Sequence, residues 1–199
     1  AALGAVYGGR YRSPYNTRTN LYTVAVAPTA AGKDHSKGYI KNLMIEAGLK
    51  TFLGSDALIS GAGLLSSLSK RSSQIMHLDE FGMLLANIGG KYAAPHLRVC
   101  ARLFTELYSA SGGTYYGGQY ADPETEPVEI VSPNLCIYGI TTMDKYVEAM
   151  DRSVISSGEL NRYVIIRPEV ERPKIIQKPI NRMPRRDIVP RRTVRTVEQ

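Results

Sequence analysis

Long apolar runs are absent from this chain of 199 residues. The longest, residues 21–27 and 135–140, are far shorter than the roughly 20 residues that a helix needs to cross a bilayer. The chain also opens without a charged and then apolar leader. We therefore expect a soluble, unsecreted protein that has no membrane as a partner.

Cysteine and histidine are scarce as well. Cys100 and Cys136 each lie inside an apolar stretch, which argues against a disulfide framework or a four-thiol metal site and predicts two buried free thiols. The three histidines, among them His35 and His77, are too scattered for a zinc site, so we expect packed or solvated side chains. No serine or cysteine stands in a pattern typical of an activated nucleophile with its base.

Acidic residues are fewer than basic ones, and the formal net charge is +7. From Pro168 onward, nine lysines and arginines face four acidic residues, so most of the excess lies in this tail. The rest of the chain is nearly balanced, as an ordinary solvated surface would be. The tail cannot be a helix and is predicted to be an extended arm, because prolines recur in it every five or six residues: Pro168, Pro173, Pro179, Pro184 and Pro190.

The apolar content of 43% predicts one main core in a chain of this length. Short β-branched or apolar runs alternate with stretches of helical period, which predicts an α/β fold with a parallel sheet of about five strands flanked by helices. The predicted strands are residues 21–26, 51–54, 74–78, 134–140 and 163–166. Predicted helices cover 1–7, begin at 33, cover 62–70, run from 81 to 109 with breaks near 89–90 and 95, and cover 143–150.

The chain divides into an N-terminal segment (1–20), a main domain (21–167) and the basic tail (168–199). In the helix that begins at residue 33, the spacing predicts Gly48 as a C-terminal cap and a buried face of Ile40, Leu43, Met44 and Ala47.

The segment between the first strand and this helix has the composition of a phosphate-binding loop. Such a loop follows G-x-x-x-x-G-K-[ST], with backbone N–H groups around the phosphates and a lysine on the outer ones. Here Ala27 replaces the first glycine and Asp34 replaces the serine or threonine. The alternative is a plain helix start with a solvated lysine. The predicted nucleotide-binding residues are Pro28, Thr29, Ala30, Ala31, Gly32, Lys33, Asp34 and His35.

Asp34 is the least expected residue of this loop. A carboxylate at this position can bind a metal ion, but it also repels phosphate. Ser36 offers a hydroxyl, yet two residues further along a helix it points elsewhere.

A second motif, Asp79-Glu80, directly follows the predicted strand 74–78. In nucleotide hydrolases a buried strand delivers an aspartate to magnesium, and the following acid orients the attacking water. Asp79 is thus a predicted metal ligand and Glu80 a predicted catalytic residue. Paired acids at this place can also cap the helix that follows.

Two further polar residues stand beside predicted strands. Thr142 follows the strand 134–140, where it could position water near the γ-phosphate or simply cap the next helix. Arg162 precedes the strand 163–166, where an arginine could stabilise charge on a neighbouring copy's nucleotide or pair with Glu159.

Residues 112–131 predict a hairpin that is rich in glycine and tyrosine. Tyr115 and Tyr116 could stack on the bases of a single strand. Four nearby acids would repel a phosphate backbone, and ordinary hairpin packing is the alternative.

Taken in order, A-P-T-A-A-G-K-D, H-L-D-E-F, a strand ending in T-T, and G-E-L-N-R-Y resemble the P-loop ATPase domain of phage and plasmid primase-helicase-like replication proteins. These are related to superfamily 3 helicases and to the broader AAA+ class. The resemblance covers residues 1–167 and implies an AAA+-like homo-oligomeric ring that uses ATP and Mg²⁺. It further implies single-stranded or forked DNA as a partner and a location in the cytoplasm of a bacterial or phage-infected cell.

On the resemblance, Lys33, Asp79, Glu80 and Arg162 fall on functional positions. The leading hypothesis is an ATP-driven DNA translocase or helicase domain. The alternative is a nucleotide-binding assembly or regulatory module in which Asp34 weakens hydrolysis. A small-molecule kinase would explain the loop but would leave the tail and Arg162 without a role.

Overall fold

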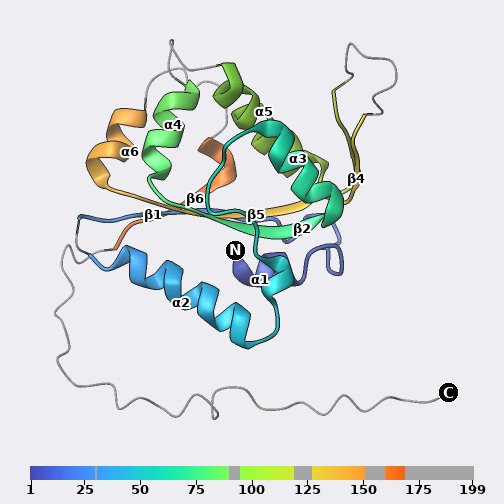
Figure 1. Cartoon of the computed structure of the whole chain (residues 1–199), viewed down its shortest axis with the longest axis horizontal. Helices are drawn as coiled ribbons and strands as arrows, with labels where there is room; N and C mark the ends of the chain where they lie inside the picture. Colours follow the sequence, from blue (N-terminus) through green and yellow to red (C-terminus); the bar gives the residue numbers. More distant parts are fainter. Residues whose placement is uncertain (30, 90–94, 119–126, 151–159, 169–199) are drawn as a thin grey trace.

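A computed structural model describes residues 1–29, 31–89, 95–118, 127–150 and 160–168. Helices cover both faces of a central sheet, which gives three layers (Figure 1). Within these ranges no helix has both the length and the apolar character that a bilayer span requires.

The central sheet is parallel and has four strands: β1 (Tyr22–Val26), β2 (Ser73–Leu78), β5 (Asn134–Thr141) and β6 (Tyr163–Ile166). Their order is β2-β5-β1-β6, so β5 lies between the strand that precedes the glycine-containing loop and the strand that precedes Asp79. The α/β class, the parallel sheet and four of the predicted strands are thereby confirmed.

The predicted strand at residues 51–54 is wrong. A short 3-10 helix, η1 (Lys50–Phe52), occupies its first half, and in the second half Leu53 forms a single parallel bridge, to Ile75 of β2. The chain then turns away from β2 and does not continue along it. Ser55 Oγ forms hydrogen bonds with the backbone of Ala57 in a tight turn, and Asp56 pairs with Lys41 at 2.6 Å. Local polar contacts here outweigh the β propensity of a four-residue run.

Four helices pack on one face of the sheet: α3 (Gly61–Lys70), α4 (Phe81–Gly89), α5 (Pro95–Ala110) and α6 (Met143–Ala149) (Figure 1). They bury the larger core together with alternate strand residues such as Tyr22, Val24 and Ile137. The other face carries α1 (Ala2–Val6) and α2 (Lys33–Glu46) over a smaller cluster.

Helix α2 ends as the sequence predicts but packs less of its apolar face. Gly48 has a φ of 74°, Leu49 N–H donates to the Met44 carbonyl at 2.8 Å, and Gly48 N–H donates to Ile45 at 3.0 Å. These bonds form a left-handed C-terminal cap. Met44 is buried and Ile40 half-buried, whereas Leu43 and Ala47 are exposed, so the predicted four-residue face is only partly correct.

Strands β3 (Thr114–Tyr116) and β4 (Glu129–Val131) pair antiparallel beside α5, as the predicted hairpin requires. Cys100 and Cys136 are both buried and free, which confirms the two thiols. The predicted arm lies outside the described residues except for Pro168.

Candidate functional site

A cavity of about 220 Å³ lies at the carboxyl ends of β1, β2 and β5. In parallel α/β sheets this edge is where ligands bind. The cavity brings together residues that are far apart in the sequence: Thr29, Gly32, Lys33, Asp34, Asp79, Glu80, Ile140, Thr141 and Thr142. Seven of the predicted site residues therefore share one space: Thr29, Gly32, Lys33, Asp34, Asp79, Glu80 and Thr142.

The loop after β1 forms one wall of the cavity. It leaves the sheet beside β5, where Ala27 N–H donates to the Thr141 carbonyl at 3.1 Å, and Ala31 N–H closes a turn onto the Pro28 carbonyl at 3.3 Å. Gly32 then adopts a φ of 78°, a left-handed conformation that suits glycine, and α2 begins at the next residue. The first turn of this 14-residue helix brings backbone N–H groups and the positive end of the helix dipole to this point.

The Lys33 ammonium bends back over the loop and donates to the Ala27 carbonyl at 3.4 Å. It therefore lies across the space that the loop encloses. A bound anion would give this ammonium a stronger partner than a neutral carbonyl, because charge-assisted hydrogen bonds are shorter and about twice as strong.

The neighbours of Lys33 differ in their orientation. Asp34 is exposed and lines the cavity, whereas His35 is exposed but does not belong to its lining. The hydroxyl of Ser36 donates to the Lys33 carbonyl at 2.7 Å and lies 2.7 Å from the Tyr138 hydroxyl, so it faces β5. Asp34 thus stands at the position of the missing loop hydroxyl and also lines the cavity, whereas Ser36 does not. Ala30 lies outside the described residues.

Asp79 and Glu80 form the wall opposite the loop, in the turn between β2 and α4. Glu80 has a φ of 49°. A non-glycine residue in the left-handed region costs on the order of 1–3 kcal/mol and is found most often at functional sites. Gly82 holds this turn against β5, because a Cβ there would lie 2.5 Å from Thr141 Oγ1.

The sequence interpretation missed Lys37. Its ammonium contacts the Asp79 carboxylate, and its side chain is only 15% exposed, against 53% for Asp79. Lys37 lies one helical turn after Lys33, so the i,i+4 spacing of the two lysines was the available signal. The ion pair holds the carboxylate of the predicted metal ligand Asp79 in place and compensates its negative charge.

The two threonines after β5 have different environments. Thr142 Oγ1 accepts the Lys145 N–H at 3.4 Å and caps α6, which bears out the structural alternative for this residue. Thr141 is buried and also lines the cavity.

The described ranges contain no cluster of three His, Cys, Asp or Glu side chains that would hold a metal ion alone. Magnesium does not require one, since it commonly takes one or two carboxylates and completes its shell with phosphate and water. Asp34, Asp79 and Glu80 line the cavity and fit that kind of shared site.

Three predicted residues lie elsewhere. Arg162 ends a short 3-10 helix, η2 (Leu160–Arg162), at the amino end of β6, on the sheet edge opposite the cavity. Tyr115 is 8% exposed and its hydroxyl donates to Glu106 of α5 at 3.1 Å, so its ring belongs to the core. Tyr116 is 66% exposed and open to a ligand.

His77 lies on β2, two residues before Asp79. It is buried, its ring meets Tyr138 edge-on at 6.0 Å, and its Nε2 has no hydrogen-bond partner among the described residues. Burial, followed by the positive charge of Lys41, lowers the pKa of His77 to about 4. His77 is therefore a neutral core residue near pH 7, in agreement with the predicted packed histidine.

No protein-family model matches the chain, and a comparison with curated proteins finds no match. A functional assignment therefore depends on the residues and geometry of the cavity.

Proposed function

We propose that the chain binds ATP with magnesium in the 220 Å³ cavity and hydrolyses it. The single observation that carries this proposal is the meeting of Lys33, Asp79 and Glu80 there, from two different strands of one sheet. A plain helix start with a solvated lysine would not require Asp79 and Glu80 to line the same space.

The residues suit the phosphates of a nucleotide. The N-terminus of α2 and the loop after β1 would receive the β-phosphate, and Lys33 would exchange the Ala27 carbonyl for the outer phosphate oxygens. When bound, magnesium would neutralise charge on those oxygens, with Asp79 and Asp34 as its protein ligands. The pairing of Asp79 with Lys37 keeps that carboxylate oriented toward the cavity.

Hydrolysis requires a base beside the terminal phosphate. Glu80 would accept a proton from water as the water oxygen bonds to the γ-phosphorus and the bond to the β,γ-bridging oxygen breaks. The products are ADP and inorganic phosphate. The left-handed backbone of Glu80 supports this role, because such strain persists where a side chain must be aimed.

Coupling of this hydrolysis to movement on DNA is the fuller form of the proposal. It is motivated by the order of the motifs, by the net charge of +7 and by the exposed Tyr116 on the hairpin. The test is the rate of ATP hydrolysis with and without single-stranded DNA. Stimulation by DNA supports a translocase or helicase domain, and an indifferent slow rate contradicts it.

A nucleotide-binding assembly or regulatory module is the second candidate. Two observations favour it. The carboxylate of Asp34 lines the cavity in which phosphate would bind, and Lys37 already forms an ion pair with Asp79. Both would slow metal-dependent turnover. ATP binding without measurable turnover would select this module.

Arg162 can contribute to hydrolysis only in another copy, since it lies at the opposite edge of the sheet. We therefore include an oligomer in the proposal. Mixing Lys33→Ala protein with Arg162→Ala protein should restore activity that neither variant shows alone. No recovery in a mixture that co-assembles by light scattering would remove Arg162 from the mechanism.

A further inference from the structure

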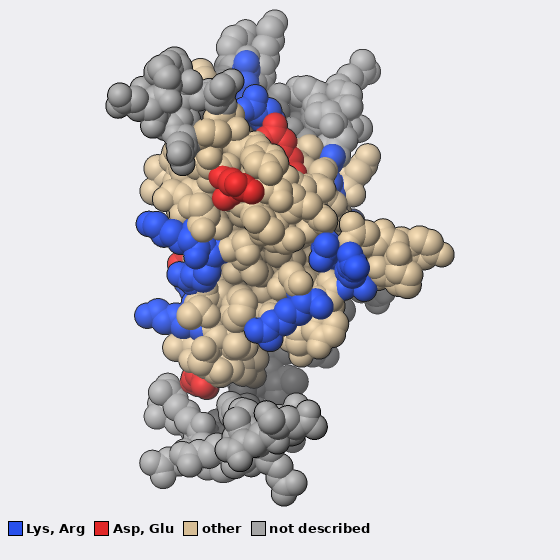
Figure 2. All heavy atoms as spheres, turned by 90° about the vertical axis from the view of Figure 1, so that its right-hand side faces the viewer, with Lys and Arg blue, Asp and Glu red and all other residues tan. Residues whose placement is uncertain are grey.

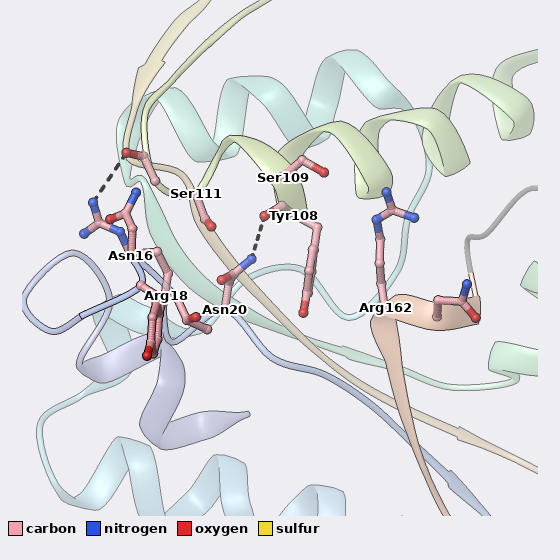
Figure 3. A pocket seen from close by; sticks show the side chains of 11 residues that line it. Asn16, Arg18, Asn20, Tyr108, Ser109, Ser111 and Arg162 are labelled. Carbon is pink, nitrogen blue, oxygen red and sulfur yellow. Dashed lines mark hydrogen bonds between the residues drawn. The ribbon is translucent and has the colours of Figure 1, made fainter. Parts of the chain in front are cut away.

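A second cavity, of about 690 Å³, lies at the amino ends of β1 and β6. Its size falls within the range of ligand pockets, about 300–1,000 Å³. Arg18 and Arg162 line it, and none of its other described lining residues is acidic: these are tyrosine, asparagine, serine, threonine and glycine. The two arginines lie at opposite ends of the cavity, with Asn20 and Tyr108 between them (Figure 3).

The loop of residues 13–17 is tightly built beside the Arg18 end. Ser13 Oγ accepts the N–H groups of Tyr15 at 3.2 Å and Thr17 at 3.0 Å, and Ser13 N–H donates to the Thr17 carbonyl at 3.0 Å. Asn16 adopts a φ of 63°, which asparagine tolerates better than most residues. The loop therefore holds Tyr15 outward, and this side chain is 93% exposed.

Arg18 is anchored but not satisfied. One terminal nitrogen donates to the Gly112 carbonyl at 3.4 Å, while Nε is buried and has no hydrogen-bond partner in the part of the chain that the structure describes. Buried donors are nearly always paired, so Arg18 keeps the capacity for a further acceptor. Asn20, which donates to the Tyr108 carbonyl at 3.0 Å, fixes the start of β1 beside it (Figure 3).

The surroundings of this end are basic and aromatic. Residues 1–33 contain no aspartate or glutamate, and Arg10, Tyr11 and Arg12 are exposed in the segment that leads to the loop. On the side of the molecule that faces the viewer in Figure 2, Lys and Arg side chains lie to the left and to the right, with fewer acidic side chains among them. Alternating arginines and tyrosines offer contacts to phosphates and to the faces of unpaired bases.

We propose that residues 8–20 and the Arg18 end of this cavity bind single-stranded nucleic acid. Phosphates contact Arg10, Arg12 and Arg18, the last from its place in the lining of the cavity. Bases stack on Tyr11 and Tyr15. A single strand fits better than a duplex because paired bases do not offer their faces to exposed tyrosines. The choice of DNA as the probe rests on the proposed function, whereas the surface itself does not.

The test is fluorescence anisotropy of a labelled oligothymidine strand without nucleotide, on the full chain. Tyr15→Ala and Arg18→Gln should each weaken binding by about fivefold or more, the first through lost stacking. Arg18→Gln should also lower the slope of log affinity against log salt by about one, as for one lost phosphate contact. The matched control is Arg102→Gln, an exposed arginine of α5 that pairs with Glu106 at 3.2 Å, and it should bind like the unaltered protein.

Three results would overturn the inference: equal losses in Arg18→Gln and Arg102→Gln, full affinity in Tyr15→Ala, or equal affinity for a single strand and its duplex. Tyr15→Ala keeps the test decisive even if Arg18→Gln disturbs the loop. ATP binding is measured in parallel, and Arg18→Gln should leave it unchanged. Loss of the oligonucleotide contrast with ATP binding intact removes only this surface, while absent ATP binding with the contrast intact removes only the proposed function.

Discussion

The ammonium of Lys37 on α2 contacts the carboxylate of Asp79 at the end of β2. This ion pair joins the helix that follows the glycine-containing loop to the turn that carries Glu80. A magnesium ion would therefore have to compete with Lys37 for the Asp79 carboxylate. The cavity therefore has a built-in means of orienting Asp79 before any metal binds.

Lys37→Met should make metal-free ATP binding weaker and lower the magnesium concentration needed for half-maximal binding. The first effect follows from a lost positive charge, and the second from a freed Asp79 carboxylate. Titration of magnesium at fixed ATP measures both. Lys41→Met is the control, because Lys41 lies one turn further along α2 and pairs with Asp56 instead. Identical behaviour of the two variants would exclude any role of the Lys37 pair.

Asp34→Asn should have the opposite effects. Without its negative charge, metal-free ATP should bind about fivefold more tightly or better, because like charges a few ångströms apart repel. The magnesium requirement should rise, since a metal ligand is lost. Glu46→Gln, at the far end of α2, removes an equal charge and should change neither quantity. An unchanged affinity for metal-free ATP in Asp34→Asn would mean that this carboxylate does not face the phosphates.

Glu80→Gln should retain ATP binding and lose turnover by roughly a hundredfold or more, because an amide keeps the shape but cannot accept a proton. Calorimetry and a phosphate-release assay separate the two quantities. Glu148→Gln on α6, an exposed acid paired with Lys145 at 2.8 Å, serves as the control. Equal losses of binding and turnover in Glu80→Gln would assign Glu80 to structure alone.

His77 should make the fold less stable in acid. Its pKa is about 4 in the folded chain against an ordinary 6.5, so the unfolded chain binds more protons between these values. Above pH 6.5 His77 is neutral in both states and does not lower the free energy of unfolding. As the pH falls toward 4, protonation of the unfolded chain lowers that free energy by on the order of 2–3 kcal/mol. Urea unfolding at several pH values should show a shallower dependence for His77→Gln than for the unaltered chain or for His35→Gln. The same slope in all three proteins would contradict this.

Much of the architecture followed from local pattern. Buried strands such as β1 and β5 read as β-branched or apolar runs, and Gly32 and Gly48 marked turns that need a positive φ. The strand at residues 51–54 failed because the contacts of Ser55 and Asp56 depend on partners that periodicity does not reveal. Tyr115 was likewise ambiguous, since a tyrosine beside glycines has the same sequence whether its ring faces α5 or a ligand.

The candidate site was predictable where residues bracket strands. Asp79 and Glu80 follow β2 directly, and Lys33 stands at the end of the loop that follows β1. Parallel strands bring such residues to one edge of the sheet. Lys37 was not predictable in its role, because its partner lies on another element. The same limit applies to Arg18, whose buried Nε–H depends on packing against the turn after α5.

The central claim is that the 220 Å³ cavity holds the phosphates of a nucleotide, and Lys33 tests it most directly. Calorimetric titration with ATP and magnesium compares the unaltered chain, Lys33→Ala and Lys41→Ala, with circular dichroism to show that all three are folded. We predict that Lys33→Ala abolishes the binding signal and that Lys41→Ala leaves it unchanged, because Lys33 lies across the loop whereas Lys41 pairs with Asp56. An ATP affinity that is the same in Lys33→Ala as in the unaltered chain would contradict the account.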